Sequence, residues 1–91
     1  MKVEKRNRFR IYYEILVILS DGMQSGKLNL TRIARKVNVP YDRFQKSMDQ
    51  LIELGLVVSR ERLVLTEEGI RYIKEYKTFE DFLGHLGFMK R

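Results

Sequence analysis

The sequence has no cysteine, one histidine and no long apolar run. Without cysteine neither disulfides nor thiolate metal sites exist, and His85, with no second ligand nearby, is not expected to bind a metal or to act as a catalytic base. The longest apolar run, residues 15–19, is far shorter than the roughly 20 residues that span a bilayer. The first ten residues are basic but lack the apolar segment of a signal peptide. We therefore expect a soluble, intracellular, cytoplasmic protein without a membrane partner.

Motifs for catalysis are also missing. The chain has no nucleophile elbow, no phosphate-binding loop and no His-rich metal pattern. The acid pairs Glu67-Glu68 and Glu80-Asp81 stand at expected helix starts, where the helix dipole accounts for them. A domain of this size is also not expected to hold a deep pocket. We expect no enzymatic activity, no cofactor and no small-molecule ligand.

Basic residues are abundant, but they are unevenly placed. The 91 residues are enough for one domain, and the 44% hydrophobic content is enough for a core without metal or disulfide. Residues 1–46 carry 11 Lys/Arg against 4 Asp/Glu, a net charge of +7, whereas residues 47–91 carry 7 against 8, a net charge of −1. A basic half attracts polyanions at long range, which favours a nucleic-acid partner over solubility alone.

The N-terminal part of the chain is predicted to be a basic arm followed by a helix. The arm covers residues 1–7, and it either follows a nucleic-acid groove or serves as a solubilising tail. The helix is expected over Arg8–Ser20, and Asp21-Gly22 is expected to end it. A lone surface helix shows one apolar stripe, but this one has two, so the second side is predicted to be covered by another subunit or by the C-terminal helix. The two stripes are Ile11, Ile15 and Ile18 on one side, and Tyr13 and Val17 on the other.

Two further helices separated by a tight turn are predicted next. The first covers Leu30–Val37, and Asn38-Val39-Pro40 forms the turn, because Asn tolerates left-handed geometry and Pro suits a first helical turn. The second covers Tyr41–Leu54 and ends before Gly55, which suits a left-handed C′ position. The residues expected to face the core are Ile33, Ala34, Val37, Phe44, Met48 and Leu51.

A small β-hairpin is predicted after these helices. Residues 56–58 and 63–65 are short β-branched runs, and the four residues between them, 59–62, form the tip. Residues 27–29 are a candidate strand that pairs with it. The predicted fold class is mainly α with a small β-hairpin: a winged helix-turn-helix over residues 8–69. In such a module the second helix usually lies in a DNA groove.

The C-terminal segment, residues 66–91, is predicted to be helical and to mediate dimerisation. Thr66 with two following acids is a good helix start. Apolar residues then follow at spacings of 4, 3, 4 and 3, which is typical of a short coiled coil. Against an unbroken helix, Thr78 with Asp81 resembles a new capping pair, and two glycines weaken the helix. We favour a long or kinked helix in a homodimer over a short helix folded back on Arg8–Ser20. The predicted dimer contacts are Tyr13, Val17, Tyr72, Tyr76, Phe79, Leu83 and Leu86.

The outward side of Tyr41–Leu54 carries the strongest signal for DNA binding. Arg43, Lys46 and Gln50 lie at i, i+3 and i+7, and side chains of these types reach base edges in the major groove. A solvated face of mixed charge is the alternative, but a basic helix and a turn precede this stripe, so we favour double-stranded DNA. The preceding helix would contact phosphates, and the arginines of the tip would contact phosphate or the minor groove, or merely keep the turn soluble. The predicted DNA-binding residues are Arg32, Arg35, Lys36, Tyr41, Arg43, Lys46, Ser47, Gln50, Arg60 and Arg62.

With these residues placed, the chain resembles the small archaeal winged helix-turn-helix proteins, including the dimeric chromatin-associated ten-a group. The resemblance covers roughly residues 8–76 and is carried by RIYYEILVIL, TRIARKVNVPYDRFQKSMDQLIELGLV and LTEEGIRYIKEY, including the LxLTxxG step at residues 63–69. It implies a homodimer joined through C-terminal helices, with recognition helices on double-stranded DNA. It assigns DNA contact to Arg32, Arg35, Tyr41, Arg43, Lys46, Arg60 and Arg62. The tail FLGHLGFMKR is shorter and richer in glycine than a long coiled coil.

Two functions follow from the sequence. The first is a dimeric, nucleoid-associated DNA-binding protein, either a transcriptional regulator or a small chromatin protein. The second is a winged-helix module that binds another protein within a larger assembly and does not bind DNA. Stacking of single-stranded bases on aromatic residues is less favoured, because the aromatic residues of the C-terminal segment lie outside the basic half.

Overall fold

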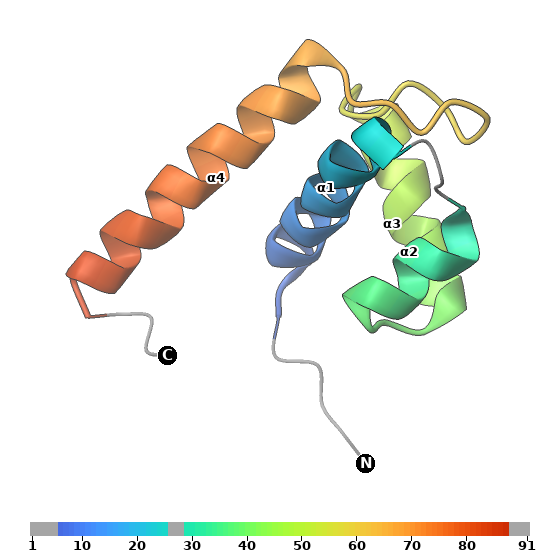
Figure 1. Cartoon of the computed structure of the whole chain (residues 1–91). Helices are drawn as coiled ribbons and strands as arrows, with labels where there is room; N and C mark the ends of the chain where they lie inside the picture. Colours follow the sequence, from blue (N-terminus) through green and yellow to red (C-terminus); the bar gives the residue numbers. More distant parts are fainter. Residues whose placement is uncertain (1–5, 26–28, 88–91) are drawn as a thin grey trace.

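The computed structural model describes residues 6–25 and 29–87, which form helices α1 (Arg8–Ser25), α2 (Leu30–Val37), α3 (Tyr41–Glu53) and α4 (Glu67–His85). Helix α1 contacts each of the other three helices. Helices α2 and α3 lie on one side of α1, and α4 lies on the other (Figure 1). Among the described helices, α4 packs against α1 only. None of the helices in these ranges has the length and apolarity needed to cross a bilayer.

The core lies between α1 and the α2–α3 pair. Helix α1 turns toward it a continuous apolar face, Ile11, Tyr12, Ile15, Leu16 and Leu19. Burial of such side chains contributes roughly 1.5–3 kcal/mol each, so this face holds the helices together. The predicted core residues of the next two helices are all buried: Ile33, Ala34, Val37, Phe44, Met48 and Leu51.

Helix α1 is longer than predicted. It continues through Asp21 and Gly22 to Ser25, so the prediction that this pair ends the helix is wrong. A glycine in a helix costs only about 1 kcal/mol relative to alanine, which the rest of the helix offsets. The predicted strand at residues 27–29 falls mostly outside the described residues. Its last member, Asn29, is instead the N-cap of α2 and accepts a hydrogen bond from the Arg32 amide at 2.8 Å.

The turn between α2 and α3 is formed as predicted. Asn38 adopts a left-handed conformation with φ of 63°, and its amide donates to the Ala34 carbonyl at 2.9 Å. Helix α3 begins after Pro40 and ends at Glu53. Gly55 follows with φ of 79°, which is the left-handed geometry that glycine adopts at helix ends. The predicted boundaries of both helices are confirmed to within one residue.

The segment between α3 and α4 is an irregular loop that pairs with itself at one point. In the described chain the pairing is a single antiparallel bridge between Val57 and Leu65, supported by a hydrogen bond from the Val58 amide to the Val64 carbonyl at 3.0 Å. The predicted β-hairpin is therefore not confirmed as a pair of strands. Val57 and Leu65 are buried, so the bridge fixes this loop against the core.

The start of α4 is held by Thr66. Its hydroxyl donates to the Gly55 carbonyl at 2.6 Å and accepts from the Gly69 amide at 3.0 Å, so it links the end of α3 to the first turn of α4. The Thr66 amide also donates to the Leu56 carbonyl at 3.1 Å. This close approach brings Gly69 against Leu56: a Cβ atom on Gly69 would lie 2.2 Å from that carbonyl oxygen. The glycine of the Thr-Glu-Glu-Gly step is thus required for packing.

Alanine at Gly69 and at Gly84 is expected to have opposite effects. Gly69→Ala forces the Leu56 backbone to move and is expected to lower the free energy of unfolding by about 2 kcal/mol. Gly84 is also in α4, but a Cβ atom on it would meet no atom of the described residues within 4 Å, so Gly84→Ala is expected to stabilise by up to about 1 kcal/mol through helix propensity. Urea denaturation of the two variants measures both changes, and equal effects would contradict this account.

Helix α4 runs without a break to His85, and Gly87 follows in left-handed geometry with φ of 87°. The suggested capping pair at Thr78 and Asp81 is wrong: the Thr78 hydroxyl donates to the Lys74 carbonyl of its own helix at 3.0 Å. The long-helix prediction therefore holds, whereas the alternative of a short last helix does not. The predicted packing against α1 in that alternative is nevertheless present, since α4 lies alongside α1 (Figure 1).

Candidate nucleic-acid interface

The outward faces of α2 and α3 carry exposed cations. Arg43 and Lys46 are exposed on α3, and none of the ion pairs or side-chain hydrogen bonds within residues 6–25 and 29–87 involves them. Gln50 is exposed in the next turn of the same helix. Three basic residues of α2 are exposed as well: Arg32, Arg35 and Lys36. The stripe predicted for α3 therefore faces solvent, and a second basic helix precedes it.

Two residues at the edges of this face differ in their exposure to solvent. Tyr41, at the start of α3, is 49% exposed and lies tilted against the Phe44 ring, with 6.2 Å between ring centroids. Ser47 is only 8% exposed, so little of its side chain is available for the DNA contact that the sequence predicts. Ser47 lies between the cationic stripe and the apolar stripe of α3, and its small side chain falls on the buried side of that boundary.

The acidic residues of α3 lie beside the cationic stripe. Asp42 and Glu53 are exposed, and the side chain of Asp49 is 68% exposed. Asp49 is not free, because it pairs with Arg60 from the loop before α4. The carboxylates thus line one border of the cationic face, where they would repel phosphates.

The two arginines of the predicted tip have different surroundings. Arg62 is exposed, and its amide donates to the Ser59 hydroxyl at 3.0 Å, which closes the turn. Arg60 instead turns back onto α3, where its guanidinium lies 2.6 Å from Asp49 and also donates to Gln45. We name these three residues, Arg60, Gln45 and Asp49, the Arg60 cluster. Of the two arginines, Arg62 alone presents its cation to solvent as the sequence predicts.

The arm is tied to the protein over the residues that the structure describes. Arg6 pairs with Glu14 and donates to the carbonyls of Val37 and Asn38, at 2.9 and 3.2 Å, at the end of α2. Arg10 pairs with Glu14 and with Glu80 of α4. Burial works against the charge of Arg10, but the hydrogen bonds and charges of the two carboxylates outweigh it and raise the pKa of Arg10. The part of the arm prediction that concerns residues 1–5 lies outside the described residues.

The aromatic residues predicted at a dimer interface divide into two groups. Tyr13 of α1 packs on Tyr76 of α4, with 5.0 Å between ring centroids, and Tyr76 stacks on Tyr72 at 5.9 Å. The Tyr72 hydroxyl donates to the Phe9 carbonyl at 2.7 Å. These three tyrosines therefore join α1 to α4 of one chain. Tyr13 belongs to the second apolar stripe of α1. The sequence predicts that either the C-terminal helix or another subunit covers this stripe, and in the structure α4 covers Tyr13.

The C-terminal half of α4 is exposed. Phe79, Phe82 and Leu86 are 54%, 56% and 51% exposed, and their spacing of three and four residues places them on one face. Leu83 is half-buried, as is Val17 of α1. The apolar spacing predicted for this helix therefore continues beyond the part that α1 covers.

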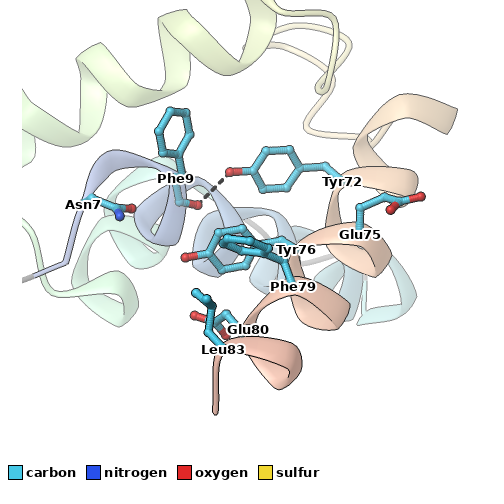
Figure 2. Close-up of a pocket in the computed structure, with 8 residues that line it drawn as sticks. All are labelled: Asn7, Phe9, Tyr72, Glu75, Tyr76, Phe79, Glu80 and Leu83. Carbon is cyan, nitrogen blue, oxygen red and sulfur yellow. Dashed lines mark hydrogen bonds between the residues drawn. The ribbon is translucent and has the colours of Figure 1, made fainter. Parts of the chain in front are cut away.

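A groove of about 590 Å³ lies between the start of α1 and α4. Figure 2 shows the aromatic rings of Phe9, Tyr72, Tyr76 and Phe79 around it. Burial raises the pKa values of the Tyr72 and Tyr76 hydroxyls, and for Tyr76 the nearby charge of Glu80 adds to this effect. The sequence does not predict the groove, because its walls come from residues 63 to 76 positions apart. Asn7, Glu75, Glu80 and Leu83 complete the lining.

Residues 6–25 and 29–87 contain no group of three His, Cys, Asp or Glu side chains that is placed to hold a metal ion. His85 is exposed at the last turn of α4.

Comparison with known proteins agrees with this arrangement. A family model described as winged helix-turn-helix matches residues 5–84. An uncharacterized protein of the archaeon Methanocaldococcus jannaschii is 36% identical over 78 residues, which cover 84% of this chain and 76% of that protein. No solved structure matches the chain.

Proposed function

Because the chain belongs to the winged helix-turn-helix family, we propose that it binds double-stranded DNA, with α3 in the major groove. The observation that carries this proposal is the exposed face formed by Arg43, Lys46 and Gln50 of α3. Arg and Lys pair with guanine in the major groove, and Gln pairs with adenine. The acids that border this face repel phosphate, so the DNA backbone would approach the face from the side that lacks them.

Phosphate contacts supply most of the affinity in this proposal. Arg32, Arg35 and Lys36 of α2 stand where the DNA backbone would flank the groove. The loop after α3, which the bridge between Val57 and Leu65 closes, serves as the wing. Arg62 is its exposed cation, which contacts phosphate or the minor groove.

The second part of the proposal is a homodimer formed through α4. The exposed face of Phe79, Phe82 and Leu86 supports it, because a soluble protein rarely leaves three large apolar side chains of one helix face in water. In a twofold dimer the two α3 helices would read half-sites about 34 Å apart on one face of the duplex. Tyr13, Val17, Tyr72, Tyr76 and Leu83 would flank the contact.

The biological role follows from these two parts. As a small dimer that binds DNA mainly through phosphate contacts, the protein acts as a transcriptional regulator or as a chromatin-associated protein. We place it in the cytoplasm, on the nucleoid, and assign it no enzymatic activity.

A salt titration tests the proposal. Fluorescence anisotropy with random-sequence duplex DNA is expected to show binding that weakens about a thousandfold between about 50 and 200 mM salt, because a dimer with about six phosphate contacts releases that many counterions. Single-stranded DNA of the same length is the control and is expected to bind more weakly. An affinity for the duplex that does not change with salt would contradict the proposed phosphate contacts.

The exposed apolar face of α4 also supports a second candidate, a module that binds another protein. In that case the chain would not bind duplex DNA even at low salt. The same titration therefore decides between the two functions.

A further inference from the structure

In the Arg60 cluster, Gln45 and Asp49 accept hydrogen bonds from almost all of the N–H donors of Arg60. The Arg60 Nη2 atom donates to the Asp49 carboxylate at 2.6 Å and to the Gln45 backbone carbonyl at 3.0 Å. Its Nε atom donates to the same carboxylate oxygen at 3.2 Å, and its Nη1 atom donates to the Gln45 side-chain oxygen. A guanidinium has five N–H donors, so little capacity is left for another partner.

The partners of Arg60 lie on a single turn of α3. Gln45 and Asp49 are four residues apart on α3, and Asp49 belongs to the border of the cationic face. Asp49 follows Lys46 by three residues, which places the two side chains next to each other on the helix surface. Arg60 is thus held beside the residues that are proposed to meet DNA, with its charge neutralised.

The Asp49 carboxylate offers Arg60 the same chemistry as a phosphate. Both groups are anions, and both accept hydrogen bonds from an arginine fork. The pair is open to solvent, since the side chains of Arg60 and Asp49 are 30% and 68% exposed. An exposed ion pair of this kind contributes little to the stability of the fold, so its removal is not expected to unfold the protein.

We propose that Asp49 holds Arg60 in an intramolecular substitute for a phosphate contact and thereby limits the affinity of this protein for DNA. The inference rests on the proposed function. Arg60 is then a positioning residue of the loop in the free protein, and not the DNA contact that the sequence predicts. Loss of Asp49 frees one cation next to α3.

The test compares four variants and the wild-type protein with random duplex DNA over a range of salt concentrations. Asp49→Ala removes the carboxylate of the Arg60 cluster. Glu53→Ala is the matched control, because it removes one exposed acid from the same border one turn further along, outside the Arg60 cluster. Arg60→Ala and the double variant Asp49→Ala/Arg60→Ala show whether the effect passes through the arginine.

Asp49→Ala is expected to bind on the order of fivefold more tightly than Glu53→Ala, and its log K is expected to fall more steeply with log salt by about 0.9, because one more phosphate is neutralised. In the Arg60→Ala background, the Asp49 substitution is expected to give no more gain than Glu53→Ala does. Arg60→Ala alone is expected to change the affinity of the wild-type protein less than about twofold, since the arginine is already engaged.

The other possible results distinguish a failure of this inference from a failure of the proposed function. Equal gains from Asp49→Ala and Glu53→Ala, or a large loss from Arg60→Ala alone, would overturn the role of the Arg60 cluster while the proposed function stands. If the wild-type protein does not bind the duplex at low salt, the proposed function fails and this inference fails with it. Circular dichroism of the variants checks that α3 is intact, which is expected because alanine favours a helix.

Discussion

Arg43→Ala combined with Lys46→Ala is expected to lower the affinity for duplex DNA by about 100-fold, because each lost contact to a base or phosphate costs about 1–3 kcal/mol. Both side chains are exposed on the outward face of α3, and neither supports the fold. The free energy of unfolding is therefore expected to stay within about 0.5 kcal/mol of the wild-type value. Anisotropy with duplex DNA at low salt measures the first quantity, and urea denaturation measures the second.

Glu53→Ala serves as the control for this double variant. The carboxylate of Glu53 is exposed at the border of the same helix, so its removal is expected to leave the affinity unchanged or slightly higher. An equal loss of affinity from the control and from the double variant would contradict the assignment of α3 as the recognition helix.

The second large effect is expected at the exposed face of α4. Phe79→Glu places a carboxylate in the proposed apolar contact, so the dimer dissociation constant is expected to rise by about 100-fold or more. Sedimentation equilibrium measures it. The affinity for duplex DNA is expected to fall as well, because the two recognition helices are no longer linked.

Lys74→Glu is a suitable control for Phe79→Glu. It also makes α4 more acidic, but Lys74 is exposed and its helical position is away from the face of Phe79, Phe82 and Leu86. The dimer is expected to persist in this variant. A Phe79→Glu protein that remains dimeric would move the interface elsewhere, and a wild-type protein that is monomeric at high concentration would refute the proposed homodimer.

Local signals in the sequence were sufficient for the helices of the fold. Phe44, Met48 and Leu51 recur at helical spacing, and all three are fully buried in α3. The sequence predicts left-handed geometry at Asn38 and Gly55, because few other residues adopt that geometry at low cost, and both have positive φ. Periodicity and backbone preference act over a few residues, so they are readable without the fold.

The secondary-structure predictions are wrong where the conformational preference of a few residues is weaker than the interactions of the rest of the chain. Asp21 and Gly22 do not end α1, because one glycine in a helix costs only about 1 kcal/mol relative to alanine. Thr78 has the right neighbours for a helix start, but in an unbroken helix its hydroxyl bonds to the Lys74 carbonyl. The hairpin between α3 and α4 shortens to one bridge, since its runs are only three residues each.

The candidate site was predictable in its composition but not in its contacts. Helical spacing predicts the exposed cations of α3, whereas the burial of Ser47 depends on packing that the spacing does not show. Arg60 lies 11 residues from Asp49 in the sequence, across the end of a helix and a loop. No periodic signal joins two such residues, so their ion pair became visible only in the folded chain.

The ion pairs that connect Arg6, Glu14, Arg10 and Glu80 have a mechanical consequence. Together with the hydrogen bond from Arg6 to the Val37 carbonyl, these ion pairs connect the end of α2, across α1, to α4, so they form one electrostatic brace across the three helices. A rotation of α4 would strain this brace and would pull on the corner between α2 and α3. In the proposed homodimer, the angle at which two copies of α4 meet would thereby affect the distance between the two α3 helices.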